Sequence, residues 1–346
     1  MKQEELLGDY SHKRQNILTG QWVLVSPHRA KRPWQGQEEK AEITKGPSYD
    51  ENCFLCPGNS RITGEQNPNY EHVYVFQNDF AALSKKVDEE LEMNSKFFKA
   101  SLESGICRVV CFSPDHSKTL SDLSFDEINY VIEVWKDQFE DLSCKDDIKY
   151  IQIFENKGAV MGCSNPHPHG QIWAQSSVPN EVKLKDQKQK TYFKKEGQSL
   201  LGDYLKEELR ENKRIVYEND SWVVLVPFWA VWPFETMIVP KERRADLSEL
   251  SVEEKLSFAQ AISKISRIYD RVFDTSFPYS SGIHQAPVDL STKAYWHMHM
   301  SFYPPLLRSA SVKKFMVGYE MFGMPQRDIS PEQVAQLLKD LGKKII

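Results

Sequence analysis

The feature that most constrains the fold of this chain is a sequence pattern that occurs twice. The stretches FSPDHSKTLSDLSFDE (112–127) and VPKERRADLSELSVEE (239–254) carry a proline, a Leu-Ser pair and a glutamate at matching positions. In each stretch the serine, Ser124 or Ser251, stands three residues before the glutamate, which is the capping-box signal of a helix start. Apolar residues then recur at steps of three and four, so an amphipathic helix is predicted after each serine.

Short runs rich in valine and isoleucine surround both predicted helices, and this composition favours β-strands. The runs lie at 72–76, 107–112, 150–156, 222–227 and 235–240. Each half then closes with a His-x-His motif, formed by His167 and His169 in the first half and by His297 and His299 in the second. The repeat predicts an α+β fold built from two copies of one unit. The alternative is a chance similarity between two ordinary α+β segments.

Length and composition set the remaining limits. A chain of 346 residues exceeds the size at which single cores stop growing, so we expect two domains, 1–180 and 181–346. The lysine-rich stretch 181–198 between them is a solvated linker or a helix. The formal charge of −5 argues against a general nucleic-acid binder. The N-terminus lacks a signal-peptide core and no run of about 20 apolar residues occurs, so a cytoplasmic protein without a membrane partner is expected.

The stretch GCSNPHPHGQIWAQ (162–175) is the strongest candidate for catalysis. In an extended strand His167, His169 and Gln171 point to the same face. A neutral imidazole can attack phosphorus and form a covalent intermediate, and His169 suits this role because Gln171 can donate a hydrogen bond to a phosphoryl oxygen. We also expect Gly170 to leave space beside His169. The alternative is a pair of surface histidines or a pair that binds only metal.

Just upstream, Cys163 and Ser164 belong to a loop of small residues whose donors could hold a second phosphate. The pair Cys53 and Cys56 offers half of a tetrahedral zinc site, because two thiolates at this spacing suit zinc. No second CxxC follows, so histidines must complete the site, and His116 and His167 are the favoured candidates. A redox pair or two buried thiols are the alternatives.

Other segments combine charge or polarity with aromatic side chains, as a sugar-phosphate pocket does. Arginines in SPHRAKRPW could pair with phosphate oxygens, Asn78 and Asp79 could hold a ribose and a base edge, and the KKFMVGYE segment could line the pocket. The alternatives are a solvated basic turn, an Asn-Asp turn and ordinary helical packing, respectively.

Taken together, these blocks resemble the galactose-1-phosphate uridylyltransferase family, a branch of the histidine triad superfamily. The resemblance rests on ILTGQWVLVSPHRAKRPW, CFLC, FSPDHSKTL, FENKG, GCSNPHPHGQIWA and FYPPLLRSASVKKFMVGYEM, and it runs from about Arg14 to Gln326. It implies two half-barrel units of antiparallel strands with packed helices, and a homodimer. It also implies a ping-pong reaction of galactose metabolism, in which His169 takes a uridylyl group from UDP-glucose and passes it to galactose 1-phosphate.

The resemblance also implies a role for individual residues. Zinc would be held by Cys53, Cys56, His116 and His167. Gln171 would steady the transferred phosphoryl group. The phosphate pocket would be lined by Asn156, Cys163 and Ser164. Uridine and sugar contacts, some of them from the neighbouring subunit, would fall on Arg29, Arg32, Ile62, Asn78, Asp79, Lys314, Phe315, Tyr319, Glu320 and Gln326.

Two positions depart from the family pattern. Bacterial relatives carry a second metal, iron, on a glutamate and three histidines of the C-terminal half. Here Lys185 stands at the glutamate position and Ser301 at the last histidine position, while His284 and His299 are kept. A protonated lysine has no lone pair to give and repels a cation. We therefore expect the second metal site to be absent, or rebuilt with His297.

Two rival functions use the same residues. A phosphorylase of the same superfamily would pass the nucleotidyl group to inorganic phosphate, and a zinc-stabilised adaptor would bind nucleotides without chemistry. Labelling the protein with UDP-glucose, with and without galactose 1-phosphate, separates the three functions.

Overall fold

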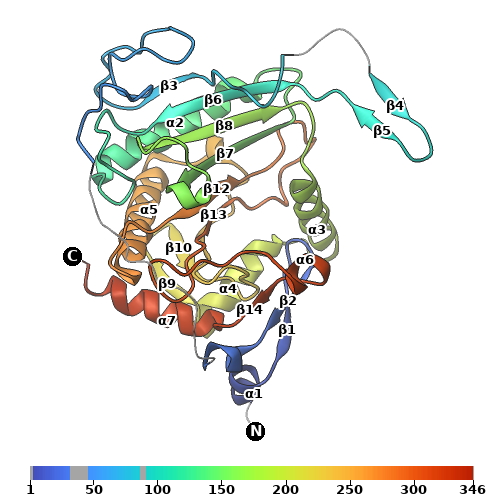
Figure 1. The fold of residues 1–346 in the computed structure, drawn as a ribbon. Coiled ribbons are helices and arrows are strands. Elements are labelled where there is room, and N and C mark those ends of the chain that lie inside the picture. Colours follow the sequence, from blue (N-terminus) through green and yellow to red (C-terminus); the bar gives the residue numbers. More distant parts are fainter. Residues whose placement is uncertain (1–2, 32–45, 86–90, 346) are drawn as a thin grey trace.

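The computed structural model describes residues 3–31, 46–85 and 91–345, and its centre is one antiparallel sheet of nine strands. The strand order is β3-β6-β8-β7-β12-β13-β11-β10-β9 (Figure 1). The strands are β3 (Tyr74–Gln77), β6 (Gly105–Cys111), β7 (Tyr150–Lys157), β8 (His169–Gln175), β9 (Ile215–Glu218), β10 (Trp222–Leu225), β11 (Thr236–Pro240), β12 (Tyr279–His284) and β13 (His299–Tyr303). The α+β class is thus confirmed, and the strands of the two halves join edge to edge into a single sheet.

The strand order confirms the internal duplication. From the outer edge of the sheet to its centre, the first half contributes β3, β6, β8 and β7, and the second half contributes β10, β11, β13 and β12. The two sets are equivalent strand by strand in this order. The equivalent strands β7 and β12 meet at the centre and pair antiparallel, with Ile153 opposite Ile283. Chance similarity would not place every equivalent strand at a mirrored position. The second half adds one further strand, β9, at its edge.

Two long helices cover one face of the sheet, one from each half (Figure 1). They are α2 (Phe125–Ser143) and α5 (Val252–Val272), and both begin with the predicted capping box, at Ser124 and Ser251. Their apolar faces pack with the inward residues of both sets of strands into one core. Helix α7 (Pro331–Gly342) adds to this layer beside α5 and β9.

The opposite face differs between the halves, and this difference positions the site. In the second half it is covered by α3 (Asn180–Glu196) and α4 (Leu200–Glu211), which pack on β10, β11 and the segment before β13. The stretch 181–198 is therefore a helix, and it buries Val182, Lys185 and Gln189. In the first half, residues 46–73 lie over β3 and β6 with a small core of cysteines and aromatic rings.

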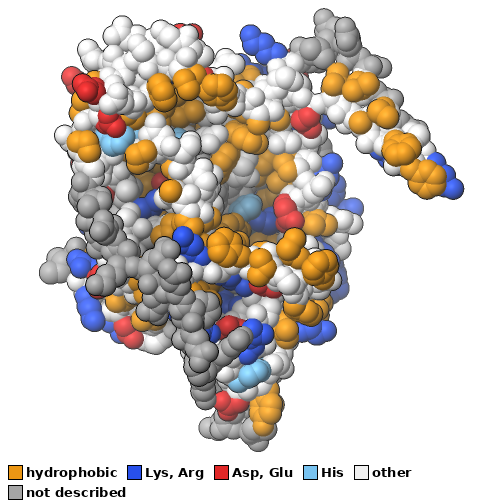
Figure 2. Space-filling view, viewed as in Figure 1, with side chains coloured by type: hydrophobic (Ala, Val, Ile, Leu, Met, Phe, Trp, Pro, Cys, Tyr) orange, Lys and Arg blue, Asp and Glu red, His pale blue; other side chains and the backbone are white. Residues whose placement is uncertain are grey.

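Smaller elements surround this body. Strands β1 (His12–Gln15), β2 (Trp22–Val25) and β14 (Gln326–Arg327) form a three-stranded sheet, flanked by α1 (Gln3–Asp9) and the short α6 (Tyr319–Phe322). A hairpin of β4 (Glu92–Asn94) and β5 (Lys99–Ser101) extends away from the body, and Figure 2 shows apolar side chains along it. Within the described residues, no helix has the length and apolar character to cross a membrane.

Candidate active site and metal centre

His169 is the first residue of β8, and its ring is held in a defined orientation. The Nδ1 N–H donates to the backbone carbonyl of His167 at 2.8 Å. The Nε2 lone pair is therefore the nucleophilic atom that remains available. Strand alternation places His169, Gln171 and Trp173 on one half-buried face, while the residues between them are buried in the core. The shared face of His169 and Gln171 is the one that the sequence predicts, whereas His167 lies in the bend before β8 and is buried.

Burial keeps the His169 ring neutral. Desolvation lowers the pKa of His169 below its ordinary value, so the unprotonated form dominates at neutral pH. The expectation that Gly170 leaves space beside His169 is wrong. A Cβ on Gly170 would lie on the opposite face, 2.8 Å from Phe112 Cζ and 2.9 Å from the carbonyl oxygen of Phe154. Glycine is needed here for close packing of the core against β8, not for space at the imidazole.

Gln171 lies two residues further along the same face and is oriented by its neighbours. Its Oε1 accepts hydrogen bonds from Trp173 Nε1 at 3.0 Å and from Asn78 Nδ2 at 3.4 Å. Asp79, next to Asn78, accepts from Thr63 Oγ1 at 3.4 Å. The structure thus brings Asn78 and Asp79 beside the catalytic strand.

Arg61 fixes the loop that carries Ile62. The buried Arg61 guanidinium lies 3.4 Å from Asp79 and stacks over the ring of Phe76 at 4.5 Å. Ile62 is 54% exposed, next to the polar group of Asn78 and Asp79. An exposed isoleucine held beside such a group offers an apolar surface to the face of a base or a sugar.

Three further predicted residues lie at the end of β7 and in the loop that leads from β7 to His169. Asn156, at the end of β7, accepts from Ser280 Oγ at 2.6 Å through its Oδ1, which leaves its NH₂ group to face a ligand. Cys163 is half-buried and donates to the Asn165 carbonyl at 3.0 Å, and burial raises the pKa of its thiol. Ser164 is exposed, one residue on. Cys163 at neutral pH is a thiol donor rather than a nucleophile.

The four predicted metal ligands converge on one point. The ligand atoms of Cys53, Cys56, His116 and His167 all lie within 4.8 Å of one another, and all four residues are buried. Cys56 Sγ is 3.5 Å from His116 Nδ1 and 3.6 Å from His167 Nδ1. Zinc bonds of ~2.3 Å to sulfur and ~2.0 Å to nitrogen give an S–N edge of about 3.5 Å in a tetrahedron. The residues therefore fit a tetrahedral zinc ion.

The protonation states of the ligands agree with this geometry. Burial lowers the pKa of His167 to about 4, so its ring is neutral and has a lone pair to donate. Its Nε2 N–H faces two acceptors at 2.9 Å, the Ser113 carbonyl and the Tyr70 hydroxyl oxygen, which leaves Nδ1 for the metal. Burial raises the pKa of Cys56 to about 11, so a bound cation is what would hold this thiol as a thiolate.

Asn165 connects the metal centre to the catalytic loop. Asn165 Nδ2 lies 3.5 Å from Cys53 Sγ, and Asn165 Oδ1 accepts a hydrogen bond from the backbone N–H of His167 at 3.0 Å. His167 in turn supplies the carbonyl that orients His169. A metal bound by His167 would therefore fix the imidazole of His169 through two short links.

The remaining predicted substrate residues form a separate group around β14 and α6. Lys314 Nζ contacts Glu320 Oε1 at 2.7 Å and the Gln326 carbonyl at 2.6 Å, and Asp328 joins Gln326 to Arg29. The rings of Phe315 and Tyr319 are exposed to solvent. Within the described residues, no hydrogen bond or ion pair links this group to His169. Arg32 lies outside the described residues.

The second His-x-His copy keeps the first copy's geometry and lacks its accessibility. His299 Nδ1 lies 3.5 Å from the His297 carbonyl, but both rings are fully buried. His297 is engaged by the Pro240 carbonyl at 2.9 Å and by Ser199 Oγ at 3.1 Å. His299 therefore cannot reach a substrate. Within the described repeats, the first histidine of each pair is buried, and only the second differs, since His169 is half-buried and His299 is fully buried.

Two residues of the site have weak signals in the sequence. Trp173 continues the two-residue period of His169 and Gln171, so its place on the same face follows from strand alternation. Tyr70 precedes its strand by several residues, and its contact with His167 depends on how the loop 46–73 folds. No local sequence pattern predicts this contact between Tyr70 and His167.

Comparison with known proteins gives a consistent result. The family model described as galactose-1-phosphate uridyl transferase, N-terminal domain, matches residues 2–179, and the model of the C-terminal domain matches residues 185–345. A galactose-1-phosphate uridylyltransferase of Haemophilus influenzae is 53% identical over 97% of this chain and 95% of its own length. One from Hypocrea jecorina is 46% identical over 97% of this chain and 96% of its own length.

Solved structures share the fold. A uridylyltransferase structure superimposes with a TM-score of 0.76 at 27% identity, covering 96% of this chain and 99% of that one. An ADP-glucose phosphorylase from Arabidopsis thaliana, solved with bound ADP-glucose, has a TM-score of 0.75 at 24% identity over 95% of this chain and 99% of its own. The second likeness concerns the fold alone.

Proposed function

Because this chain belongs to the galactose-1-phosphate uridyl transferase family, we propose that it transfers UMP from UDP-glucose to galactose 1-phosphate through a uridylyl group on His169. Relatives that carry this activity in their names match the chain over nearly its full length. The observation that carries the proposal is the neutral His169 ring, whose Nδ1 N–H is tied to the His167 carbonyl while Nε2 remains on the face of Gln171.

In the first half-reaction, His169 Nε2 attacks the α-phosphorus of UDP-glucose. A P–N bond forms, the bond from the α-phosphorus to the bridging oxygen breaks, and glucose 1-phosphate leaves. The imidazole gains positive charge, which the His167 carbonyl stabilises at Nδ1–H. The leaving group is a phosphate ester that needs no proton, so no general acid is required.

In the second half-reaction, a phosphate oxygen of galactose 1-phosphate attacks the same phosphorus and breaks the P–N bond, which gives UDP-galactose. The bonds exchanged are of the same kind, so positioning and charge stabilisation set the rate. Gln171 donates to the phosphoryl oxygens, and Asn156, Cys163 and Ser164 hold the second phosphate of either sugar nucleotide. Ile62, Asn78 and Asp79 take the uridine.

The metal centre would hold zinc on Cys53, Cys56, His116 and His167. Bound there, zinc supplies rigidity rather than Lewis-acid chemistry, because four protein ligands close the tetrahedron. The chain's own residues transmit that rigidity, since Asn165 and the His167 carbonyl link the centre to His169.

The test is labelling with UDP-glucose that carries a radiolabel in the uridine. The wild-type protein should retain label after gel filtration, and galactose 1-phosphate should remove it as UDP-galactose. His169→Asn should retain none, while its metal content stays unchanged. Full transfer activity in His169→Asn would overturn the proposal.

The same protein separates the rival functions. Inorganic phosphate should not discharge the labelled enzyme, whereas a phosphorylase would release UDP. Binding of UDP-glucose without any labelling would indicate an adaptor. The incubation with UDP-glucose therefore identifies an adaptor, and the later addition of phosphate identifies a phosphorylase.

We further propose that no second metal occupies the C-terminal half. Lys185 Nζ lies 3.0 Å from His284 Nδ1, and the His284 ring stacks on His299 with centroids 4.7 Å apart. The lysine ammonium thus donates a hydrogen bond to the His284 lone pair that a metal cation would have to bind. Within the described residues, the cysteine-histidine group is the one cluster of three or more metal-binding side chains. Elemental analysis should give one metal per chain, and two would contradict this.

A homodimer fits the division of the predicted substrate residues into two groups. The group of Lys314, Phe315, Tyr319, Glu320 and Gln326, with Arg29 beside it, would complete the site of a partner chain. The hairpin of β4 and β5 carries Phe97 and Phe98 at 77% and 68% exposure, as an intersubunit contact would require. Light scattering should give twice the chain mass, and a monomer that is fully active would contradict the proposal.

We also propose a cytoplasmic location and a division of the chain at 1–180 and 181–346. All six cysteines lie within the described residues and form no disulfide, as expected in a reducing compartment. The boundary is supported by the change from one repeat to the next between β8 and α3. Fractionation and limited proteolysis test the two points.

A further inference from the structure

We propose that Trp173 is a positioning residue that fixes which end of the Gln171 amide faces the substrate. The inference rests on the proposed uridylyl transfer. The indole Nε1–H donates to Gln171 Oε1 at 3.0 Å. An indole nitrogen can only donate, so its partner must be the oxygen end of the amide.

A second donor acts in the same sense. Asn78 Nδ2 lies 3.4 Å from the same Gln171 oxygen. If the amide turned over, its NH₂ group would face the indole donor, and the strong Trp173 bond would be lost. The two donors therefore hold the oxygen back and leave both N–H groups of Gln171 Nε2 for the reacting phosphoryl group.

The Trp173 ring is itself held in place. It is half-buried on β8, opposite Cys107 on β6 and Gln152 on β7. Its edge packs on the Phe154 ring, with centroids 5.5 Å apart and an interplanar angle of 80°. The indole N–H direction is thus set by the place of Trp173 within the sheet and by its packing on Phe154, and Gln171 receives a fixed donor rather than a mobile one.

The expected effect falls on the chemical step. A well-aimed donor stabilises the negative charge on the phosphoryl oxygens most in the transition state. Loss of the orientation of the Gln171 amide therefore lowers kcat more than it raises KM. Trp173→Phe keeps the ring and removes the N–H. The loss of one oriented hydrogen bond should lower the single-turnover rate of uridylylation by about three-fold to ten-fold, with KM for UDP-glucose changed by less than about two-fold.

The decisive measurement is a double-mutant cycle with Gln171→Ala. If Trp173 acts through Gln171, Trp173→Phe has no further effect once the amide is gone. Gln171→Glu adds a test of polarity, because a carboxylate still accepts from the indole but has no N–H to give. This variant should lose at least as much rate as Gln171→Ala.

Trp222→Phe is the matched control. Trp222 lies in the same sheet, and its Nε1 donates to the Glu254 carbonyl at 2.8 Å in the core, away from His169. Trp222→Phe should be less stable than the wild-type protein. The fraction of it that becomes labelled should be labelled at the wild-type rate. The amplitude of labelling measures how much of each variant is folded, so a folding defect is not counted as a slower step.

Three outcomes decide the matter. A rate loss in Trp173→Phe that vanishes in the Gln171→Ala background supports the inference. An unchanged rate in Trp173→Phe, or an equal loss in both backgrounds, overturns it. Failure of the wild-type protein to become labelled would instead overturn the proposed uridylyl transfer.

Discussion

At the scale of single residues, the proposed function depends on two histidines that share one motif and have different tasks. His167 offers its Nδ1 to the metal group and its carbonyl to His169, and His169 keeps Nε2 for substrate. Pro168 between them fixes one backbone dihedral angle, φ, of the connecting residue. In the proposed mechanism, a metal bound by His167 would thus help to orient His169, although it would take no part in the reaction itself.

Removal of one metal ligand should therefore reduce both stability and rate. Cys56→Ser should lose the bound metal and on the order of 4 kcal/mol of unfolding free energy, because binding to the folded state alone is what stabilises it. Metal analysis, urea unfolding and the single-turnover rate of uridylylation measure the loss of metal, of stability and of rate, respectively.

Cys144→Ser serves as the control. This cysteine is exposed at the end of α2 and contacts no metal ligand in the described part of the chain. It should leave metal content and stability unchanged. A Cys56→Ser protein with full metal content would contradict the assignment.

At the scale of elements, β8 carries the proposed catalytic residues on one face and packs into the core with the other. The catalytic face could be predicted from the sequence, because HPHGQ alternates in the manner of a strand. The opposite face could not, since the close approach of Phe112 and the Phe154 carbonyl to Gly170 depends on two neighbouring strands. Gly170 is therefore a packing position that sequence reasoning assigned to the wrong side.

Gly170→Ala tests this packing. The new Cβ would lie 2.9 Å from a backbone carbonyl, which cannot move as a side chain can. We expect a loss of roughly 1–3 kcal/mol in unfolding free energy. Gly8→Ala is the control, because nothing lies within 4 Å of its Cβ position. Equal stability of Gly170→Ala and the wild-type protein would show that β8 tolerates the change.

The predicted helices and strands of both halves were confirmed, since capping boxes and valine-rich runs are local signals. The joining of the two sets of strands at β7 and β12 was not predictable, because pairing between Ile153 and Ile283 is set by tertiary packing. The separate place of the Lys314 and Gln326 group is likewise a result of chain topology, as β14 pairs with β2 near the N-terminus.

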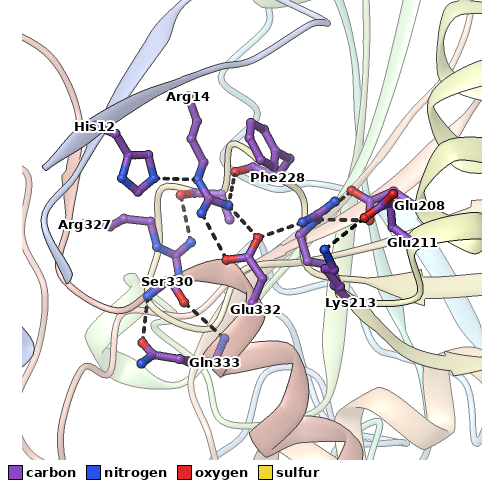
Figure 3. Close-up of polar contacts among 12 residues, drawn as sticks. His12, Arg14, Glu208, Glu211, Lys213, Phe228, Arg327, Ser330, Glu332 and Gln333 are labelled. Carbon is purple, nitrogen blue, oxygen red and sulfur yellow. Dashed lines mark hydrogen bonds and ion pairs between the residues drawn. The ribbon is translucent and has the colours of Figure 1, made fainter. Parts of the chain in front are cut away.

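At the scale of the whole molecule, a buried ion network fastens the N-terminal strand β1 to the C-terminal helix α7 (Figure 3). Arg14, 1% exposed, contacts both carboxylate oxygens of Glu332, at 2.8 and 3.1 Å, and stacks over the Phe228 ring at 4.3 Å. Arg214 joins Glu332 to Glu208 through bonds of 2.7 and 2.9 Å. One carboxylate thus neutralises cations from two parts of the chain.

Glu332→Gln should destabilise the protein strongly, because it leaves two arginines without their shared anion. We expect a loss of about 3–5 kcal/mol in unfolding free energy. The control is Asp340→Asn, which breaks an exposed pair with Lys343 and should cost less than about 1 kcal/mol. Equal effects of the two substitutions would contradict a structural role for the network.

The same network predicts a pH dependence. Burial alone would raise the pKa of Glu332, but hydrogen bonds and charge from Arg14 and Arg214 outweigh it and lower the pKa from 4.5 to about 2. A lowered pKa stabilises the folded state above the ordinary value of 4.5, and this contribution is lost as the pH falls toward 2. The stability difference between wild-type protein and Glu332→Gln should be constant above pH 5 and shrink below pH 4.5. A difference independent of pH would rule out titration of Glu332.

The most direct test of the central claim is to find the residue that carries the uridylyl group. Wild-type protein incubated with UDP-glucose alone, then digested and mapped by mass spectrometry under neutral conditions, should show the added group on the peptide with His169 and at its ring. Brief exposure to galactose 1-phosphate should remove it. A uridylyl group on any other residue, or a peptide that stays unmodified while UDP-galactose forms, would contradict the account.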